Sequence, residues 1–98
     1  MRKYLELNDF LGTGSIDKEM EELGKRIKDI RRRRGYSQAE FADRSGVSLG
    51  SLKRFEQTGE ISLRHLWGIA EALDLGDELS HLFMVVPKTR QEIWGEEE

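Results

Sequence analysis

Apolar residues recur at helical spacing along most of the chain, and short breaks containing glycine or serine separate the repeats. The first repeat lies between Ser15 and Arg34, where the apolar positions are three or four residues apart: Met20, Leu23, Ile27 and Ile30. This spacing predicts an amphipathic helix with a single buried stripe. Ser15 or Asp17 should begin the helix, and Gly35 should end it.

The segment after Gly35 has the signals of a short helix. Ser37 and Glu40 are three residues apart, which is the spacing of a capping box, where each side chain bonds the other residue's backbone N–H. This pair predicts a helix over residues 38–45. Gly46 should end that helix, because glycine adopts the left-handed backbone conformation at little cost.

A second short helix should follow at once over residues 49–57, with Ser48 as its N-cap. At 100° per residue, Leu52 and Phe55 point inward together. The opposite face should be exposed, and it comprises Gly50, Lys53, Arg54 and Gln57. Two helices joined by a short turn containing glycine form a helix-turn-helix, whose second helix can enter the major groove of DNA.

Two further helices complete an all-α domain of five helices. Ser62 should cap the fourth helix, whose apolar stripe comprises Leu63, Leu66, Ile69, Ala70 and Leu73. Trp67 lies beside this stripe, and both a core position and an interface position are open for it. A turn at residues 75–76 should precede a fifth helix over residues 77–83. Residues 83–86 favour a brief strand that ends before proline.

A chain of 98 residues is enough for one domain. We expect a flexible N-terminal arm over residues 1–14, a helix-turn-helix domain over residues 15–86 and a charged C-terminal tail over residues 87–98. The apolar residues of the arm could instead pack on the domain or on a partner: Tyr4, Leu5, Leu7, Phe10 and Leu11. For Ile93 and Trp94 in the tail, packing on the domain and docking on a partner are equal alternatives.

The net charge of −3 by itself argues against binding to nucleic acid, but the charge is unevenly distributed along the chain. Residues 22–57 contain ten Lys or Arg and five Asp or Glu, so this segment carries +5 and the remainder carries −8. Basic charge clustered in one segment predicts a phosphate-binding surface. The run from Arg31 to Arg34 contributes most, but four consecutive helical residues spread over about 300° of the helix. We therefore expect only one or two of these arginines to reach phosphates.

Several classes of protein are excluded by composition. The chain has no cysteine, so it can form neither a disulfide framework nor a cysteine-based metal site. His65 and His81 stand alone, and no catalytic constellation or phosphate-binding glycine loop is recognisable. We predict no enzyme activity, no catalytic residue, no metal and no cofactor. With no apolar run of membrane-spanning length and no secretory signal, we expect no membrane association and a cytoplasmic location.

Three stretches, SQAEFA at 37–42, SGVS at 45–48 and SLKRFE at 51–56, resemble the Cro/cI repressor-type helix-turn-helix family, often called XRE-like. The resemblance covers about residues 23–83 and implies a five-helix, lambda-repressor-like DNA-binding fold. Residues 46–62 (GVSLGSLKRFEQTGEIS) are also similar to a subgroup of HipB-like antitoxins, the small partners of HipA-like kinase toxins.

The resemblance implies that residues 49–57 are the recognition helix. The expected DNA-binding residues are Gln38, Ser48, Leu49, Gly50, Lys53, Arg54 and Gln57. Gln38 matches a position that commonly bonds a DNA phosphate, and Lys53 is also expected to hold phosphate. Arg54 is the best candidate for bidentate recognition of guanine.

The pair Leu49–Gly50 departs from the family pattern, because relatives often carry polar residues such as glutamines there. Leu49 can still touch a thymine methyl group, and Gly50 can let the backbone approach the duplex. Arg31 and Glu56 match an ion pair between helices in related repressors, which implies a structural role for both.

These features predict a sequence-specific transcriptional regulator that represses by occupying a pseudo-palindromic operator in double-stranded DNA as a homodimer. The fifth helix and residues 83–86 are the predicted dimer contact. A first alternative adds a protein partner, as an antitoxin that binds a HipA-like toxin and autoregulates its operon. A second alternative is a protein-interaction module of the same fold that does not bind DNA.

Overall fold

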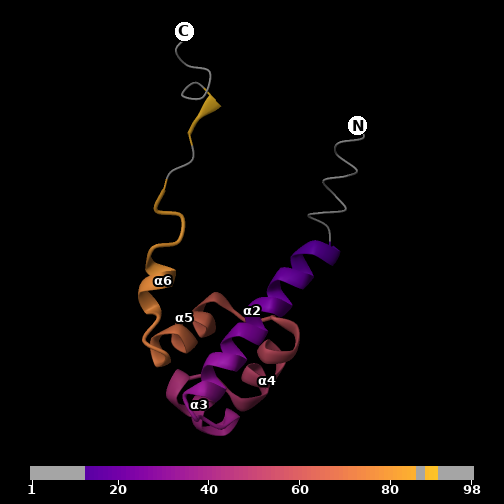
Figure 1. Cartoon of the computed structure of the whole chain (residues 1–98), viewed down its shortest axis with the longest axis vertical. Coiled ribbons are helices and arrows are strands. Elements are labelled where there is room, and N and C mark those ends of the chain that lie inside the picture. The colour runs from indigo at the N-terminus through magenta and orange to yellow at the C-terminus, as the bar shows by residue number, and fades with distance from the viewer. Residues whose placement is uncertain (1–12, 86–87, 91–98) are drawn as a thin grey trace.

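The computed structural model describes residues 13–85 and 88–90, and five helices follow one another in this part of the chain (Figure 1). They are α2 (Thr13–Arg33), α3 (Gln38–Ser45), α4 (Leu49–Thr58), α5 (Leu63–Ala72) and α6 (Gly76–Ser80). The all-α fold class is therefore confirmed. None of these helices is long and apolar enough to cross a membrane.

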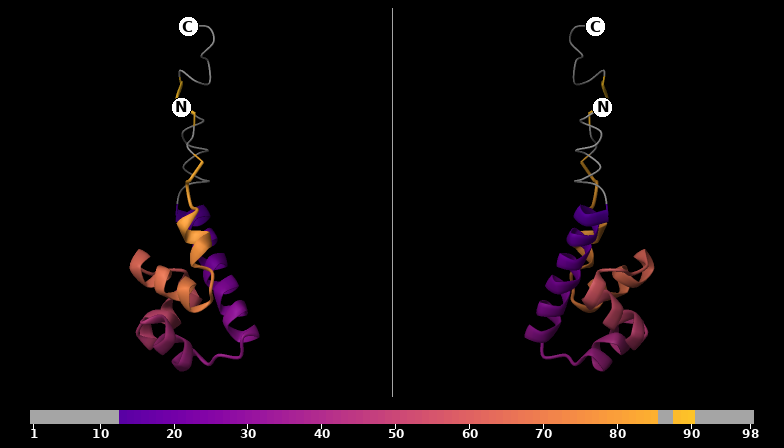
Figure 2. Two further views of the ribbon diagram at one scale, coloured as in Figure 1. Left: turned by 90° about the vertical axis from the view of Figure 1, so that its left-hand side faces the viewer. Right: turned by 90° about the vertical axis from the view of Figure 1, so that its right-hand side faces the viewer.

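The long helix α2 lies along one side of the shorter helices α3, α4 and α5 (Figure 2). It packs mainly against α4, while α3 contacts both α4 and α5. Two close approaches between helices occur at glycines. A Cβ atom on Gly24 would overlap the carbonyl oxygen of Phe55, and one on Gly68 would overlap the carbonyl oxygen of Ser45. The absence of a side chain at these positions lets α2 meet α4 and lets α5 meet α3.

The core lies where α2, α3, α4 and α5 converge. Its fully buried large side chains are Phe41, Leu52, Phe55, Ile69 and Leu73. Ile27, Ala42 and Val47 join the same cluster, which Leu23 and Ile30 cover from α2. The predicted apolar stripes of residues 15–34 and 38–57 thus face the core.

The predicted caps of the helix-turn-helix are present. The Ser37 hydroxyl accepts from the Glu40 backbone N–H at 3.1 Å, and the Glu40 carboxylate accepts from the Ser37 backbone N–H at 3.2 Å. Gly46 ends α3 with a left-handed φ of 71°. The hydroxyls of Ser48 and Ser62 accept from backbone N–H groups in the first turns of α4 and α5. Local sequence therefore sets the ends of these helices.

The ends of α2 and α6 differ from the prediction. Helix α2 begins at Thr13, before the predicted start at Ser15 or Asp17. The turn before α6 was predicted at residues 75–76 but lies at residues 73–74, where Asp74 adopts the left-handed conformation with φ 60°. The N–H of Leu75 then bonds the carbonyl of Ala70 at 2.8 Å, which closes the end of α5.

Helix α6 ends at Ser80, three residues before its predicted end. The predicted strand over residues 83–86 is wrong for the described residues 83–85, which form a turn and a bend. Phe83 has a φ of 58°, which is incompatible with an extended strand. Residues 1–12, 86–87 and 91–98 lie outside the described residues, and with them most of the predicted arm and the tail residues Ile93 and Trp94.

Candidate nucleic-acid interface

Helix α4 presents one face to the core and the opposite face to solvent. Leu52 and Phe55 are fully buried. The predicted outward residues Gly50, Lys53, Arg54 and Gln57 are all exposed, as are Ser48 and Leu49 at the start of the helix. The structure therefore leaves six of the seven predicted DNA-binding residues accessible to a ligand.

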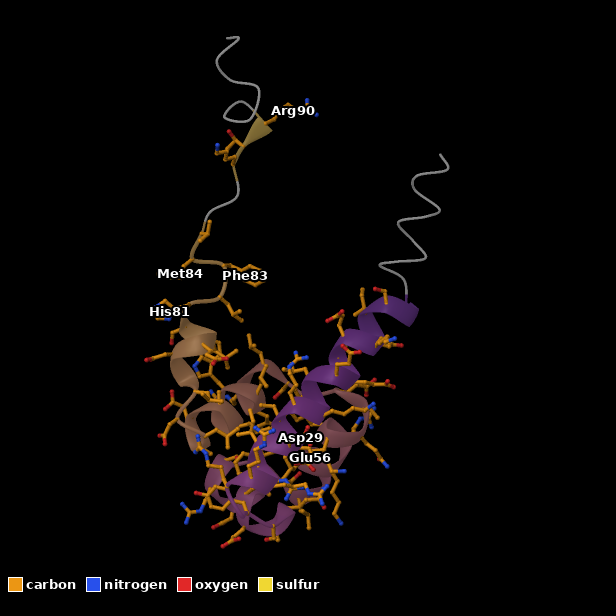
Figure 3. The ribbon with its side chains drawn as sticks, viewed as in Figure 1. Asp29, Glu56, His81, Phe83, Met84 and Arg90 are labelled. Carbon is orange, nitrogen blue, oxygen red and sulfur yellow. The ribbon has the colours of Figure 1, made fainter. Side chains whose placement is uncertain are left out.

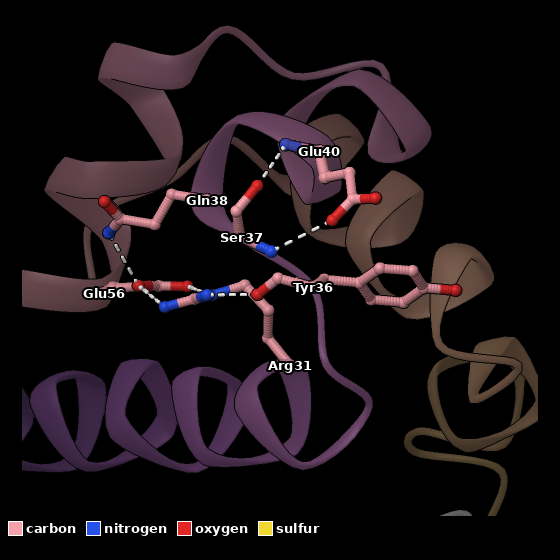
Figure 4. Close-up of polar contacts among 6 residues, drawn as sticks. All are labelled: Arg31, Tyr36, Ser37, Gln38, Glu40 and Glu56. Carbon is pink, nitrogen blue, oxygen red and sulfur yellow. Dashed lines mark hydrogen bonds and ion pairs between the residues drawn. The ribbon is translucent and has the colours of Figure 1, made fainter.

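The seventh residue, Gln38, lies at the start of α3, beside the exposed face of α4. It takes part in a buried polar network (Figure 4). At its centre, the guanidinium of Arg31 donates from Nε to Glu56 Oε2 at 2.7 Å and from Nη2 to Oε1 at 3.1 Å. Arg31 Nη1 also donates to the carbonyl of Tyr36 at 2.6 Å. The Gln38 amide donates to Glu56 Oε1 at 2.9 Å.

This network neutralises the only acid on α4. Arg31 and Glu56 are each 6% exposed, so both charges are removed from water and depend on each other. The ion pair implied by the family resemblance is thus present, and it joins α2 to α4. The exposed face of α4 is left with basic and neutral side chains only.

A polar notch opens beside the network, between α2, α3 and α4. Its lining residues are Lys28, Gln38, Lys53, Glu56 and Gln57. Two lysines from different helices therefore converge where an anion can bind, and the nearby carboxylate is already paired. Lys28 was missed by sequence reasoning. It precedes Arg31 by three residues and so shares its helical face, and this spacing could have identified it.

Arg54 has a partner that was also missed. Its Nε donates to Glu60 Oε1 at 2.9 Å, and its Nη2 donates to the same oxygen. Both side chains remain largely exposed, at 68% for Arg54 and 53% for Glu60. The residue predicted to read guanine is therefore paired with an acid that follows α4 in the chain.

The structure separates the four arginines at the end of α2. Arg31 is buried in the network, and Arg34 Nη2 donates to the carbonyl of Leu73 at 2.9 Å. Arg32 and Arg33 are exposed. Two of the four thus hold the fold together, and two are left to face solvent or a ligand.

Neither histidine belongs to a metal-binding group among the residues that the structure describes. His81 Nδ1 lies 2.7 Å from the carbonyl of Asp77, and His65 lies in the first turn of α5. His65 thus lies within α5, and His81 directly follows α6.

Two apolar surfaces lie away from α4. On α5, Leu63 is 64% exposed and forms a shallow hollow with Trp67, which is 36% exposed. The predicted buried position of Leu63 is therefore wrong, because helical spacing identifies an apolar side but not how far a neighbouring helix covers it. After α6, Phe83 and Met84 extend beyond the helical body that encloses Glu56 (Figure 3).

The comparisons with known proteins agree with this geometry. The helix-turn-helix family matches residues 27–78, which is more than half of the chain. A protein of Pyrococcus abyssi (strain GE5 / Orsay), provisionally named an HTH-type transcriptional regulatory protein, is 48% identical over 46 residues. That match covers 42% of this chain and 15% of the relative's length. No solved structure matches the chain significantly. The chain belongs to the helix-turn-helix family of the Cro/cI repressor type.

Proposed function

We propose that this protein is a sequence-specific, DNA-binding transcriptional regulator. The observation that carries the proposal is the exposed face of α4, where Lys53 and Arg54 project while Glu56 is buried and neutralised by Arg31. DNA presents a dense array of phosphates, so exposed basic side chains on a helix without an unpaired carboxylate favour DNA as the ligand.

The roles of the residues follow from their positions. Lys28, Lys53 and Gln38 border the notch and are suited to a backbone phosphate, which fixes the register of the protein on the duplex. Arg54 lies one turn beyond Gly50 and is suited to guanine O6 and N7, a contact worth about 1–3 kcal/mol of discrimination. At the tip of the helix, Leu49 is 39% exposed and available for a thymine methyl group.

We further propose a homodimer that represses by occupying a pseudo-palindromic operator. One recognition helix reads only a few base pairs, so two copies are needed for high specificity, with half-sites roughly 34–36 Å apart. The candidate dimer surface is α6 with the apolar residues that follow it. Their exposed fractions are 51% for Leu82, 92% for Phe83, 64% for Met84 and 86% for Val85. Burial of these side chains against a second copy would remove them from water.

Selection of bound sequences from random DNA tests the DNA role and the symmetry together. We expect an enriched pseudo-palindrome, with binding that weakens steeply as salt rises. The double variant Lys53→Ala, Arg54→Ala should lose this binding, whereas Lys18→Ala, an exposed change on the first half of α2, should keep it. Wild-type protein without salt-dependent DNA binding would leave only the protein-interaction alternative.

The dimer is tested by light scattering after size exclusion, with and without the selected operator. Phe83→Glu should convert a dimer to a monomer, because a charge would replace an apolar contact. Leu63→Glu is the matched control, since Leu63 is similarly exposed but lies on α5. A wild-type monomer at micromolar concentration, also on operator DNA, would contradict the dimer.

A second candidate function is that of an antitoxin that binds a HipA-like toxin and autoregulates its operon. The observation that favours a protein partner is the hollow on α5, where Leu63 and Trp67 present apolar surface. An adjacent HipA-like reading frame, together with loss of co-purification of that protein for Trp67→Glu, would support it. Co-purification that survives this change would argue against this surface.

A further inference from the structure

We infer that Glu60 is a specificity-determining residue, which positions Arg54 for reading guanine and opposes its contact with phosphate. The inference rests on the proposed DNA-binding function. It starts from the ion pair between these two side chains, which links the exposed face of α4 to the turn that follows the helix.

The backbone holds Glu60 next to Arg54. The hydroxyl of Thr58 donates to the carbonyl of Arg54 at 2.8 Å and accepts from the backbone N–H of Glu60 at 3.1 Å. Between them, Gly59 has a left-handed φ of 82°, and its N–H bonds the carbonyl of Phe55 at 2.7 Å. Gly59 is itself buried against the backbone of Met20. The turn is therefore tied to both α4 and α2, and the carboxylate of Glu60 is kept within reach of Arg54.

The geometry of the pair leaves one edge of the guanidinium available. Glu60 accepts from Nε and Nη2, which lie on the side edge of the group. The other edge carries Nη1 and the second hydrogen of Nη2, which form the end-on fork. A fork of two N–H donors matches the O6 and N7 acceptors of guanine. Arg54 can therefore bond guanine without releasing Glu60.

Phosphate differs from guanine as a ligand of Arg54 because phosphate carries a negative charge. A phosphate beside Arg54 would also lie near the Glu60 carboxylate, and the two negative charges repel each other. Guanine presents neutral acceptors and avoids this repulsion. Glu60 should thus weaken the contact of Arg54 with phosphate, which every DNA sequence offers. At the same time it keeps the guanidinium oriented toward guanine.

The test compares Glu60→Gln with wild type on the selected operator, on the operator with the contacted guanine replaced, and on unrelated DNA of equal length. We expect Glu60→Gln to bind unrelated DNA about two- to fivefold more tightly. The slope of log affinity against log salt should steepen by about one, for one additional phosphate contact. The preference for the guanine operator should fall by a similar factor. Thr58→Val, which removes the hydroxyl that fixes the turn, should act in the same direction.

Two controls isolate the effect. Glu21→Gln removes an equal charge at an exposed position on α2 and should change none of these quantities beyond a small uniform factor. In an Arg54→Ala background, Glu60→Gln should lose its effect, because Glu60 acts through Arg54. Equal changes for all three DNAs, or an effect that persists without Arg54, would overturn the inference and leave DNA binding intact. Absence of salt-dependent binding by wild type would instead overturn the proposed function, and this inference with it.

Discussion

Arg31 and Glu56 are 25 residues apart in sequence, yet the Arg31 Nε lies 2.7 Å from Glu56 Oε2 in the interior of the protein. The pair connects the end of α2 to the recognition helix α4, and Gln38 at the start of α3 bonds the same carboxylate. One buried acid thus sets the relative positions of the three helices that surround the proposed DNA-binding surface.

Glu56→Ala should therefore destabilise the fold strongly. The change leaves the Arg31 guanidinium buried without its partner, and loss of one member of a buried pair costs about 3–5 kcal/mol. Urea unfolding followed by circular dichroism measures the effect. Arg33→Ala, at an exposed position on α2, is the control and should change stability by less than about 0.5 kcal/mol. A loss below about 1 kcal/mol for Glu56→Ala would mean that the pair is not held in solution.

Gly24→Ala should also destabilise, although alanine favours helix. The added Cβ would meet the Phe55 carbonyl oxygen, so α2 and α4 must separate, and overpacking of this kind costs about 1–3 kcal/mol. The comparison is Gly50→Ala on α4, where a Cβ would meet nothing within 4 Å. That change should stabilise the protein by up to about 1 kcal/mol. Equal shifts in melting temperature for both variants would contradict the close approach at Gly24.

Gly50→Ala should separate stability from binding. If the backbone at this position approaches the duplex, the added methyl group weakens operator binding in a protein that has become more stable. Fluorescence anisotropy with labelled operator, measured beside thermal unfolding, reports both quantities. Operator affinity that stays at the wild-type value would show that the duplex does not come close to α4 at Gly50.

Lys28→Ala should weaken binding to all DNA sequences by a similar factor. Its ammonium group borders the notch assigned to phosphate, so its loss should reduce the salt dependence of log affinity by about one. Lys25→Ala is the matched control, because Lys25 is exposed on the same helix but does not line the notch. The two variants are compared by titration at several salt concentrations. Equal effects would point to general charge rather than to a defined phosphate site.

The ends of the helices around the turn were predictable because local interactions set them. Ser37 with Glu40 forms a cap between neighbouring residues, and Gly46 supplies a backbone conformation that depends on that residue alone. The same reasoning failed after α5, where the turn was predicted at residues 75–76 but lies at residues 73–74, with Asp74 in the left-handed conformation. Aspartate also tolerates this conformation, so the two positions were not distinguishable by residue type.

The periodicity of apolar residues identified the apolar face of each helix, but not how much of that face is covered by neighbouring helices. Leu52 and Phe55 are buried as predicted, because neighbouring helices lie over them. Leu63 belongs to an equally regular stripe and is exposed at the first position of α5. Whether a side chain is covered depends on where another helix begins and ends, and no pattern within one helix contains that information.

The sequence by itself determined the all-α class, the helix-turn-helix and the outward face of α4, since capping, glycine and helical spacing act over a few residues. Only the tertiary structure decided which polar groups meet across the chain. It brought Lys28 beside Lys53, and it paired Arg54 with Glu60 across the turn at Gly59. These contacts depend on the angle and separation of whole helices, which Gly24 and Gly68 set by allowing close approach.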